Sequence, residues 1–447
     1  MGAFKAYDIR GIYNKDLNKE TAYRVGYFLP QLLPCDFVVV GRDIRLTSDE
    51  IHDNLCKGIN DRGVDVWDIG LSTTPMVYFA TVYLKAGASV QITASHNPKE
   101  YNGMKISRSG AVPVGGDSGL KDLERLCSEG VVEPVVPEKR GKIVQKDIHE
   151  AYLSYLKQFL PDLENLNISV DCSNGMSNLY VKELFGDHAK YINDTLDGTF
   201  PGHEPNPLEE ENCAQIKEAV LKNKSDVGVI YDGDADRVMF IDDRGRFLQP
   251  DNITAVIGAY YLEKEKGPVL VDIRTSRSTS EYLKKKGATE IITWKVGHAY
   301  AKMKIREKQC IFGGELAGHY YFRDFHNCDS GILASLLVLQ TVASLKKEGK
   351  TLGQLLDEII VYANSGEVNF KLEQKDEAMK ALYDEYKTRK PDKILDFDGY
   401  RIEFPTWWFN VRKSNTEPYL RLVVEAKSKE LLDEKFKELE AIIKKFK

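Results

Sequence analysis

Short runs of β-branched residues alternate along the chain with segments that begin in small polar residues and continue with helical spacing. Three such runs cover residues 37–43 (FVVVGRD), 168–175 (ISVDCSNG) and 269–276 (VLVDIRTS). Continuous Val/Ile runs followed by helix-start residues are typical of parallel strands that are buried on both faces and lead into helices. The pattern predicts an α/β fold, and its recurrence favours one βα-rich unit used three times.

Loop-like composition divides the chain into four parts. Proline, glycine and charge gather at residues 130–142 (GVVEPVVPEKRGK), 242–251 (DDRGRFLQPD) and 362–367 (YANSGE), which we expect to be loops. The predicted domains are therefore residues 1–145, 146–247, 248–360 and 361–447.

The last part differs in pattern from the other three. It has a charged helical stretch near residues 376–389, then the strand-like runs RIEF, WWFNV and LRLVVEA, and finally a Lys/Glu-rich amphipathic helix. This order predicts a small α+β domain, and the charged face of the final helix is interpreted as solvated. The predicted fold class is α/β: three similar α/β domains with mixed sheets plus a smaller C-terminal α+β domain.

Composition narrows the classes of function. The 447 residues carry 62 Lys+Arg against 68 Asp+Glu, a net charge of −6, so we expect no nucleic acid as a partner. The longest apolar stretch, residues 331–345, is shorter than the roughly 20 residues that span a bilayer. We interpret it as a buried helix and expect no membrane partner. The N-terminal MGAFKAYDIRG shows no targeting signal, and seven scattered cysteines indicate a reduced, cytoplasmic protein.

The sharpest chemical signal is an acidic triplet in DVGVIYDGDADRVMFID, residues 226–242. Asp232, Asp234 and Asp236 alternate between two apolar runs. Three carboxylates so close repel one another unless a divalent cation neutralises them, and oxygen-only ligands favour Mg²⁺. A solvated acidic turn is the alternative. An EF-hand is excluded because Arg237 occupies the position that needs glycine.

Two further segments carry chemistry that is weak when each stands alone. Ser95 lies at a strand exit in QITASHNPKEYNGMK, beside His96 and ten residues before Lys105. It is either a nucleophile or a turn residue. Glu315, in IFGGELAGHYYFRD, is either an acceptor for sugar hydroxyls or an acid in an ordinary glycine-rich turn.

A polar turn near the C-terminus concentrates hydrogen-bond donors. In NVRKSNTEPYLRL, Arg412, Ser414, Asn415 and Thr416 stand within five residues. A guanidinium, hydroxyls and backbone N–H groups make up a phosphate cradle. An ordinary polar turn before a strand is the alternative.

Together these segments resemble the α-D-phosphohexomutases, the phosphomannomutase/phosphoglucomutase superfamily. FKAYDIRG, TASHNP, DGDADR, GGELAGH and RKSNTEP occur in the family's order over nearly the whole chain. The resemblance implies a phosphoserine at Ser95, Mg²⁺ held by the acidic triplet with Ser95, sugar binding by Glu315 and a distal phosphate site at Arg412, Ser414, Asn415 and Thr416. The further catalytic residues that it implies are Arg10, His96, Lys105, Arg237 and His298, and the further substrate-binding residues are Tyr7, Arg274, Lys295 and His319.

The implied activity is that of an isomerase. The phosphoserine would donate its phosphoryl group to a hexose monophosphate, and the resulting hexose 1,6-bisphosphate, also the expected activator, would turn around in a central cleft. His96, Lys105 and His298 are unranked candidates for the general acid or base. We expect hexose phosphates as partners and a monomer or homodimer.

Two positions bear on the choice of sugar. Ala317 stands where many relatives have serine, which leaves the sugar preference open, whereas Asn415 argues against a phosphoglucosamine mutase. The chain resembles bacterial phosphomannomutases most, which favours mannose 6-phosphate and mannose 1-phosphate. The alternatives are a phosphoglucomutase or a dual-specificity enzyme, and less favoured ones are a Mg-dependent sugar phosphatase and a non-catalytic sugar-phosphate sensor.

Overall fold

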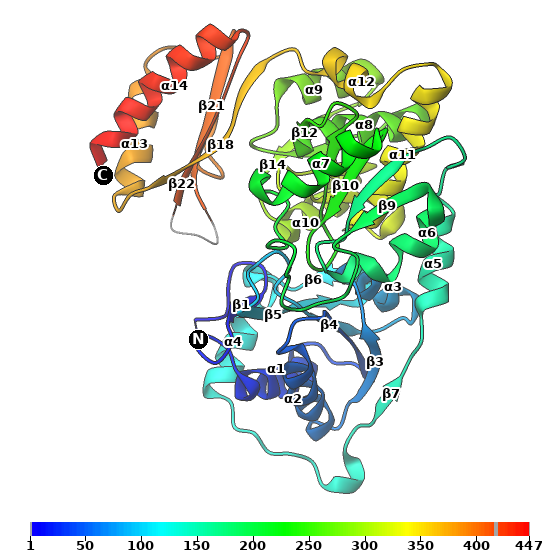
Figure 1. Ribbon diagram of the computed structural model, residues 1–447. Coiled ribbons are helices and arrows are strands. Elements are labelled where there is room, and N and C mark those ends of the chain that lie inside the picture. The colour runs from blue at the N-terminus through cyan, green and yellow to red at the C-terminus, as the bar shows by residue number, and fades with distance from the viewer. Residues whose placement is uncertain (1, 415–418, 447) are drawn as a thin grey trace.

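The computed structural model describes residues 2–414 and 419–446, and this part of the chain forms four β-sheets in chain order (Figure 1). The first sheet has the strand order β1-β5-β4-β2-β3-β7, with β6 paired to β5. The second, third and fourth sheets have the orders β12-β11-β10-β8-β9, β14-β13-β15-β16-β17 and β18-β22-β21-β20-β19. We call the four sheets with their helices the first to fourth units.

The elements of the first unit are β1 (Ile9–Ile12), α1 (Lys19–Leu32), β2 (Phe37–Arg42), α2 (Ser48–Asp61), β3 (Asp65–Leu71), α3 (Thr74–Tyr83), β4 (Ala88–Ile92), β5 (Tyr101–Arg108), β6 (Val112–Pro113), α4 (Leu120–Glu129) and β7 (Ile143–Gln145). Those of the second are α5 (His149–Lys157), β8 (Ile168–Asp171), α6 (Val181–Phe185), β9 (Ala189–Ile192), α7 (Ala214–Asn223), β10 (Val227–Tyr231), β11 (Val238–Asp242) and β12 (Phe247–Leu248).

The elements of the third unit are α8 (Pro250–Lys264), β13 (Val269–Asp272), α9 (Arg277–Lys286), β14 (Ile291–Trp294), α10 (His298–Lys308), β15 (Phe312–Gly314), β16 (Tyr320–Phe322), β17 (Cys328–Asp329), α11 (Gly331–Lys347) and α12 (Leu352–Ile359). Those of the fourth are β18 (Ala363–Lys371), α13 (Lys375–Lys387), β19 (Lys393–Leu395), β20 (Tyr400–Phe404), β21 (Trp407–Lys413), β22 (Tyr419–Ala426) and α14 (Lys429–Ile443).

The first three sheets share one topology. Each contains a core of three parallel strands, which are β3-β2-β4, β9-β8-β10 and β14-β13-β15, and in the first sheet β7 adds a fourth parallel strand next to β3. In each, an antiparallel strand, β5, β11 or β16, then pairs with the last member of that core. The Val/Ile runs at 37–43, 168–175 and 269–276 form β2, β8 and β13, the central strand of each core. The predicted α/β class with mixed sheets is thereby confirmed.

The fourth sheet is antiparallel throughout, and α13 and α14 accompany it, as the α+β prediction requires (Figure 1). The expectation of a loop at residues 362–367 is wrong in part, because β18 begins at Ala363. Its register shifts between Asn364 and Glu367, where Gly366 has a φ of +66°. A bulge accommodates the turn-forming residues that suggested a loop.

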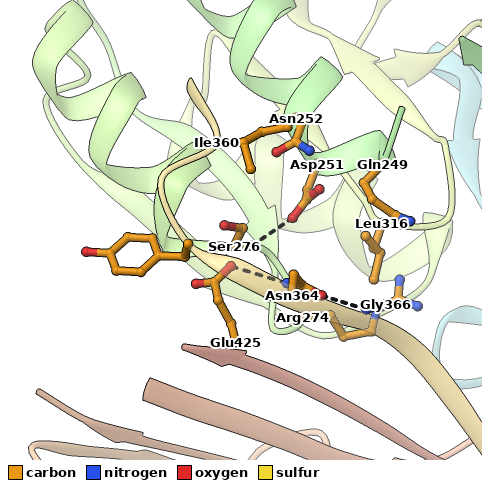
Figure 2. A pocket seen from close by; sticks show the side chains of 11 residues that line it. Gln249, Asp251, Asn252, Arg274, Ser276, Leu316, Ile360, Asn364, Gly366 and Glu425 are labelled. Carbon is orange, nitrogen blue, oxygen red and sulfur yellow. Dashed lines mark hydrogen bonds between the residues drawn. The ribbon is translucent and has the colours of Figure 1, made fainter. Parts of the chain in front are cut away.

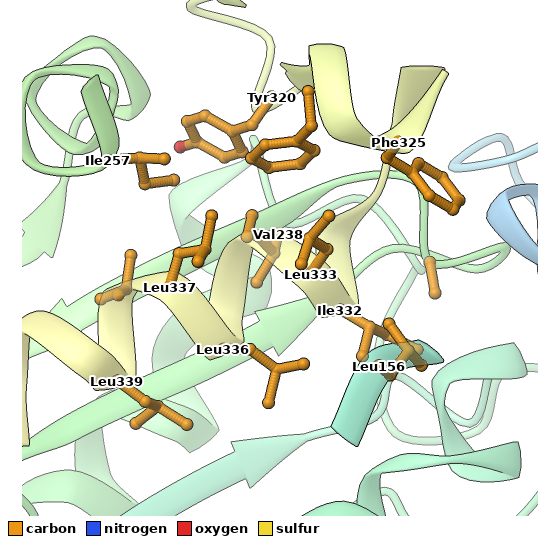
Figure 3. Packing of buried hydrophobic residues seen from close by; sticks show 14 of the residues in the cluster. Leu156, Val238, Ile257, Tyr320, Phe325, Ile332, Leu333, Leu336, Leu337 and Leu339 are labelled. Carbon is orange, nitrogen blue, oxygen red and sulfur yellow. The ribbon is translucent and has the colours of Figure 1, made fainter. Parts of the chain in front are cut away.

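Helix α11 lies at the centre of the largest hydrophobic cluster (Figure 3). Ile332, Leu333 and Leu336 of this helix are fully buried, which confirms the predicted buried helix at 331–345. The same cluster includes Met76 of α3 and Leu156 of α5, so it joins the first unit to the second and third. The fourth unit has a separate cluster of its own. The first three units therefore pack as one block.

Among the described helices, none combines the length and the apolar character needed to cross a bilayer.

Candidate active site and metal centre

Ser95 follows β4 in a left-handed backbone conformation, with a φ of 53°. Such a φ is uncommon for a residue other than glycine and is kept only where neighbours impose it. The Ser95 N–H donates to Thr93 Oγ1 over 2.9 Å, and Arg45 Nη2 donates to the Ser95 carbonyl over 2.8 Å. Its buried hydroxyl donates to Asp232 Oδ2 over 2.8 Å. The local fold therefore aims the hydroxyl at the acidic triplet.

The acidic triplet lies between β10 and β11, as predicted, and all three of its side chains are fully buried. Asp232, Asp234 and Asp236 each offer an oxygen, and these atoms lie within 4.8 Å of one another. Asp234 Oδ1 and Asp236 Oδ1 have no hydrogen-bond partner within residues 2–414 and 419–446. Buried acceptors without a donor fit a bound cation, and an all-oxygen donor set fits Mg²⁺.

Lys105 supplies the nearest positive charge to this triplet. Its Nζ lies 2.7 Å from Asp234 Oδ2 and 2.5 Å from Asp236 Oδ2. Burial disfavours the charged ammonium, but the two carboxylates outweigh it and raise the pKa of Lys105. Burial, followed by the charges of Asp234 and Asp236, raises the pKa of Asp232. Burial acts the same way on Asp236, but Lys105, His319 and Arg237 together outweigh it and the pKa of Asp236 falls.

Two arginines and a histidine complete this side of the site. The Arg237 backbone N–H donates to Asp232 Oδ1 over 3.2 Å, and its Nε lies 3.9 Å from Asp232 Oδ2. Arg10 Nη1 donates to Asn97 Oδ1 over 2.7 Å. Burial lowers the pKa of His96, and the charges of Arg237 and Arg10 lower it further, so the imidazole is neutral at pH 7.

A buried charge network lies on the other side of the triplet. His319 Nδ1 is 2.7 Å from Asp329 Oδ2 and 3.9 Å from Asp236 Oδ1, and Lys302 Nζ is 2.6 Å from Asp329 Oδ1. The rings of His319 and His298 lie 6.0 Å apart. Burial, followed by the charge of Lys302, lowers the pKa of His298. The structure therefore brings His319 next to Asp236 of the acidic triplet, and His298 next to His319.

The predicted sugar-binding segment is held by backbone and side-chain contacts. Glu315 Oε1 accepts from the Gly297 N–H over 2.6 Å, and Oε2 accepts from the Tyr321 hydroxyl. Burial raises the pKa of Glu315. The hydroxyl of Tyr7 donates to the Val296 carbonyl over 2.9 Å, next to Gly297. Residues of the first and third units therefore meet here.

Arg274 and Lys295 occupy two further positions in the third unit. The buried Arg274 forms ion pairs with Asp272 Oδ2 at 2.7 Å and with Glu367 Oε2 of the fourth unit at 2.9 Å. It lines a small pocket between the two units (Figure 2). Lys295 Nζ lies 5.6 Å from the ring centre of Tyr300. In the described part of the chain, no hydrogen bond or ion pair joins Arg274 or Lys295 to the acidic triplet.

Arg412, which the sequence predicts to be part of a phosphate site, lies in β21. Its Nε lies 3.2 Å from Asp398 Oδ1, whereas Nη2 is buried and has no hydrogen-bond partner among the described residues. The Ser414 N–H donates to the Tyr419 carbonyl over 2.9 Å. Asn415 and Thr416 lie outside the described residues. A buried guanidinium nitrogen without an acceptor is suited to an anion.

Three residues of the site carry no signal in the sequence, namely Thr74, Lys302 and Asp329. Thr74 Oγ1 donates to Asp234 Oδ2 over 2.5 Å. The sequence TTP marks a helix start, but no local pattern identifies a partner 160 residues away. Asp329 and Lys302 likewise stand in stretches that are typical of an ordinary helix cap and an ordinary charged helix.

Sequence models of one family match four successive parts of the chain. They are described as phosphoglucomutase/phosphomannomutase α/β/α domain I (residues 1–129), domain II (150–245), domain III (249–362) and C-terminal domain (367–442). The phosphomannomutase of Escherichia coli K12 is 38% identical over 442 residues, covering 96% of this chain and 95% of that protein. The phosphomannomutase of Vibrio cholerae serotype O1 is 35% identical over 465 residues, covering 100% and 99%.

Solved structures agree with this match. A phosphoglucomutase/phosphomannomutase family protein from Burkholderia thailandensis superposes with a TM-score of 0.89 at 27% identity, covering 99% of this chain and 97% of that one. The N-acetylphosphoglucosamine mutase of Aspergillus fumigatus, solved with GlcNAc-6P and magnesium, has a TM-score of 0.62 at 14% identity, with 98% and 95% covered. The latter likeness shows the fold alone.

Proposed function

The chain belongs to the phosphoglucomutase/phosphomannomutase family and is a phosphohexomutase, an isomerase, and we propose that it interconverts mannose 6-phosphate and mannose 1-phosphate. The choice of mannose is supported by full-length relatives that are named phosphomannomutase at 35–38% identity. The observation that carries the chemistry is the contact between the Ser95 hydroxyl and Asp232, because it joins a nucleophile to a cluster suited to a cation.

The phosphoryl-carrying residue in this proposal is Ser95. Mg²⁺ held by Asp232, Asp234, Asp236 and Ser95 would supply neutralising charge for the phosphoryl group. In the unphosphorylated protein Asp232 accepts a hydrogen bond from the Ser95 hydroxyl, which directs Oγ toward the acidic triplet. In the forward step the bond from Ser95 Oγ to phosphorus breaks and a sugar oxygen bonds to phosphorus. The proton of that sugar hydroxyl passes to a base.

The electrostatics narrow the candidates for this base. His96 and His298 have lowered pKa values and are neutral at pH 7, so either can accept a proton. Lys105 has a raised pKa and stays protonated, so it can stabilise charge or donate a proton but not accept one. Arg10 and Arg237 are proposed to surround the transferring group with positive charge.

The second phosphate of the substrate needs an anchor away from Ser95. We assign it to Arg412 with Ser414, Asn415 and Thr416, supported by the buried Nη2 of Arg412, which has no hydrogen-bond partner among the described residues. A hexose 1,6-bisphosphate formed at Ser95 would turn around so that each phosphate visits the anchor, and the same compound would serve as the activator. The proposed contacts to the sugar are Glu315 with Tyr7, Arg274, Lys295 and His319.

The organisation of the chain is part of the proposal. We propose domains at residues 1–145, 146–247, 248–360 and 361–447, supported by the matched ranges and the four sheets. A reduced, cytoplasmic protein is supported by seven free cysteines, six of them buried. We propose that it acts as a monomer or homodimer.

Incubation of the purified protein with Mg²⁺, mannose 6-phosphate and a trace of hexose 1,6-bisphosphate tests the activity. The proposal expects mannose 1-phosphate, whereas release of inorganic phosphate would indicate a sugar phosphatase and contradict it. A parallel assay on glucose 1-phosphate measures the sugar preference that Ala317 leaves open. A larger kcat/KM for glucose 1-phosphate than for mannose 1-phosphate would contradict the assignment of mannose and favour a phosphoglucomutase.

A further inference from the structure

Thr74 of the first unit forms hydrogen bonds with Asp234, in the loop of the second unit that carries the acidic triplet. It is the first residue of α3, and its fully buried hydroxyl donates to Asp234 Oδ2 over 2.5 Å. Its backbone N–H donates to the Asp234 carbonyl over 3.1 Å. The first N–H groups of a helix have no partner within the helix, so the Asp234 carbonyl satisfies one of them. One residue thus holds both the backbone and the side chain of Asp234.

This contact decides which oxygen of Asp234 is left for a cation. Oδ2 accepts from Thr74 Oγ1 and also from Lys105 Nζ, 2.7 Å away. Oδ1 is buried and, within residues 2–414 and 419–446, has no hydrogen-bond partner. A carboxylate with one oxygen held by protein donors presents the other in a fixed direction, as outer-shell donors do at metal sites.

The helix itself does not need the Thr74 hydroxyl. Thr73 is the N-cap of α3, and its Oγ1 accepts from the Met76 N–H over 3.1 Å. Pro75 follows at a position that favours helix initiation. The start of α3 is therefore capped without the hydrogen bond from the Thr74 hydroxyl to Asp234. The remaining effect of that bond is to orient the Asp234 carboxylate.

We propose that Thr74 is a positioning residue of the metal centre, which orients Asp234 for coordination through Oδ1 from a different structural unit. This inference rests on the proposed Mg²⁺ site. Because the Thr74 hydroxyl is neutral, its removal leaves the charge of the site unchanged. A loss of affinity would therefore report lost orientation rather than altered electrostatics.

The test compares Thr74→Val, which keeps the shape and removes the hydroxyl, with Thr74→Ser, which keeps the hydroxyl. Thr81→Val is the matched control, because Thr81 is buried in the same helix and its hydroxyl donates to Val77 O over 2.6 Å and lies 2.7 Å from Ser89 Oγ. Isothermal titration of Mg²⁺ into the metal-free, dephosphorylated full chain gives each dissociation constant. We expect Thr74→Val to raise it at least tenfold, and the other two variants to stay within threefold of the wild type.

Activity gives an independent readout. Thr74→Val should raise the Mg²⁺ concentration for half-maximal turnover by a similar factor, while kcat at saturating Mg²⁺ stays within threefold. Equal Mg²⁺ affinity in Thr74→Val and the wild type would overturn the positioning role alone. An equal loss of Mg²⁺ affinity in Thr81→Val would also overturn the positioning role, because the effect would then come from general destabilisation of the fold. If the wild type binds no Mg²⁺, the proposed metal site is wrong and the inference falls with it.

Discussion

The hydroxyl of Ser95 and the carboxylate of Asp232 lie 2.8 Å apart although 137 positions separate them in the chain. Ser95 follows β4 of the first sheet, and Asp232 follows β10 of the second. In both sheets these strands belong to the parallel core and pair with an antiparallel strand on their other side. Corresponding strand ends of two repeated units thus face each other and bring one residue from each into the proposed reaction centre.

Replacing Ser95 with alanine should abolish turnover while leaving substrate binding intact. Without Oγ no bond to phosphorus can form, so we expect kcat to fall at least 10³-fold. The dissociation constant for mannose 6-phosphate should change less than about fivefold, because the proposed phosphate anchor at Arg412 is untouched. Coupled assays and calorimetry measure the two quantities.

The matched control is Ser107→Ala, a buried serine of β5 that lies outside the site. It should keep turnover within threefold of the wild type. Turnover retained in Ser95→Ala would contradict the phosphoserine mechanism. Mass spectrometry of the wild type should also place a phosphoryl group on Ser95 after incubation with hexose 1,6-bisphosphate, and on no other serine.

Removal of divalent metal should lower both activity and thermal stability. Within the described residues, Lys105 and the more distant Arg237 balance the three buried carboxylates of the acidic triplet only in part, so a bound cation relieves the remaining repulsion. Chelation should abolish isomerisation, and added Mg²⁺ should restore it. Saturating Mg²⁺ at 100 times its dissociation constant should stabilise the fold by about 2.7 kcal/mol, seen as a higher Tm. A Tm that does not change when Mg²⁺ is added would contradict the proposed metal site.

Much of the fold follows from local patterns, because the signals for its elements are short-range. The runs at 37–43, 168–175 and 269–276 contain enough Val and Ile to specify buried strands, and each forms the middle strand of three parallel strands, β3-β2-β4, β9-β8-β10 or β14-β13-β15. The prediction of a loop at residues 362–367 is wrong in part, because Asn, Ser and Gly there form a bulge inside β18. The same residue types suit either structure, and only pairing with β22 decides between them.

The site divides in the same way. The residue types and spacing of the acidic triplet indicate a cation site directly, whereas the role of Ser95 follows only from the resemblance of its motif to the family. Lys302 and Asp329 lie 27 positions apart and form a fully buried ion pair 2.6 Å long. Neither belongs to a motif, and the sequence around each is typical of an ordinary surface charge. Whether a charged pair is buried depends on the assembled fold. The local sequence therefore wrongly predicts that Lys302 and Asp329 are exposed.

Replacing Arg412 with alanine should weaken substrate binding more than it slows the chemistry. The guanidinium is buried, and its Nη2 has no hydrogen-bond acceptor among the described residues. A bound phosphate would therefore accept a charge-assisted hydrogen bond from Nη2. We expect KM for mannose 1-phosphate to rise about 10- to 100-fold. That range corresponds to about 1.5–3 kcal/mol, the usual contribution of a hydrogen bond to a charged group.

Lys413→Ala is the control for this change. Lys413 is the next residue along β21, but it is exposed and pairs with Asp376 at 2.7 Å. A surface ion pair contributes about 1 kcal/mol or less, so KM should stay within threefold. Equal effects of the two substitutions would show that the net charge of the loop, rather than a specific contact of Arg412, binds the phosphate.

Asp251 should make the stability of the protein depend on pH. It lies at the start of α8, buried in the pocket between the third and fourth units, where its Oδ2 accepts from the Ser276 N–H over 2.9 Å (Figure 2). Burial, with the charges of Glu425 and Asp272, raises the pKa of Asp251 to about 7. An unfolded chain releases this proton near pH 4. Between those values only the folded state holds the proton, so stability falls as pH rises through this window.

The expected slope is up to about 1.4 kcal/mol per pH unit, and Asp251→Asn should remove it, because asparagine keeps an acceptor for Ser276 and does not titrate. Thermal unfolding at pH 5, 6, 7 and 8 measures the difference. The Tm of the wild type should fall relative to that of Asp251→Asn as pH rises to 7 and then run parallel to it. Asp122→Asn, at an exposed position of α4, should follow the wild type throughout. Parallel curves for the wild type and Asp251→Asn over the whole range would mean that Asp251 is ionised in the folded protein, and that the Ser276 N–H outweighs burial.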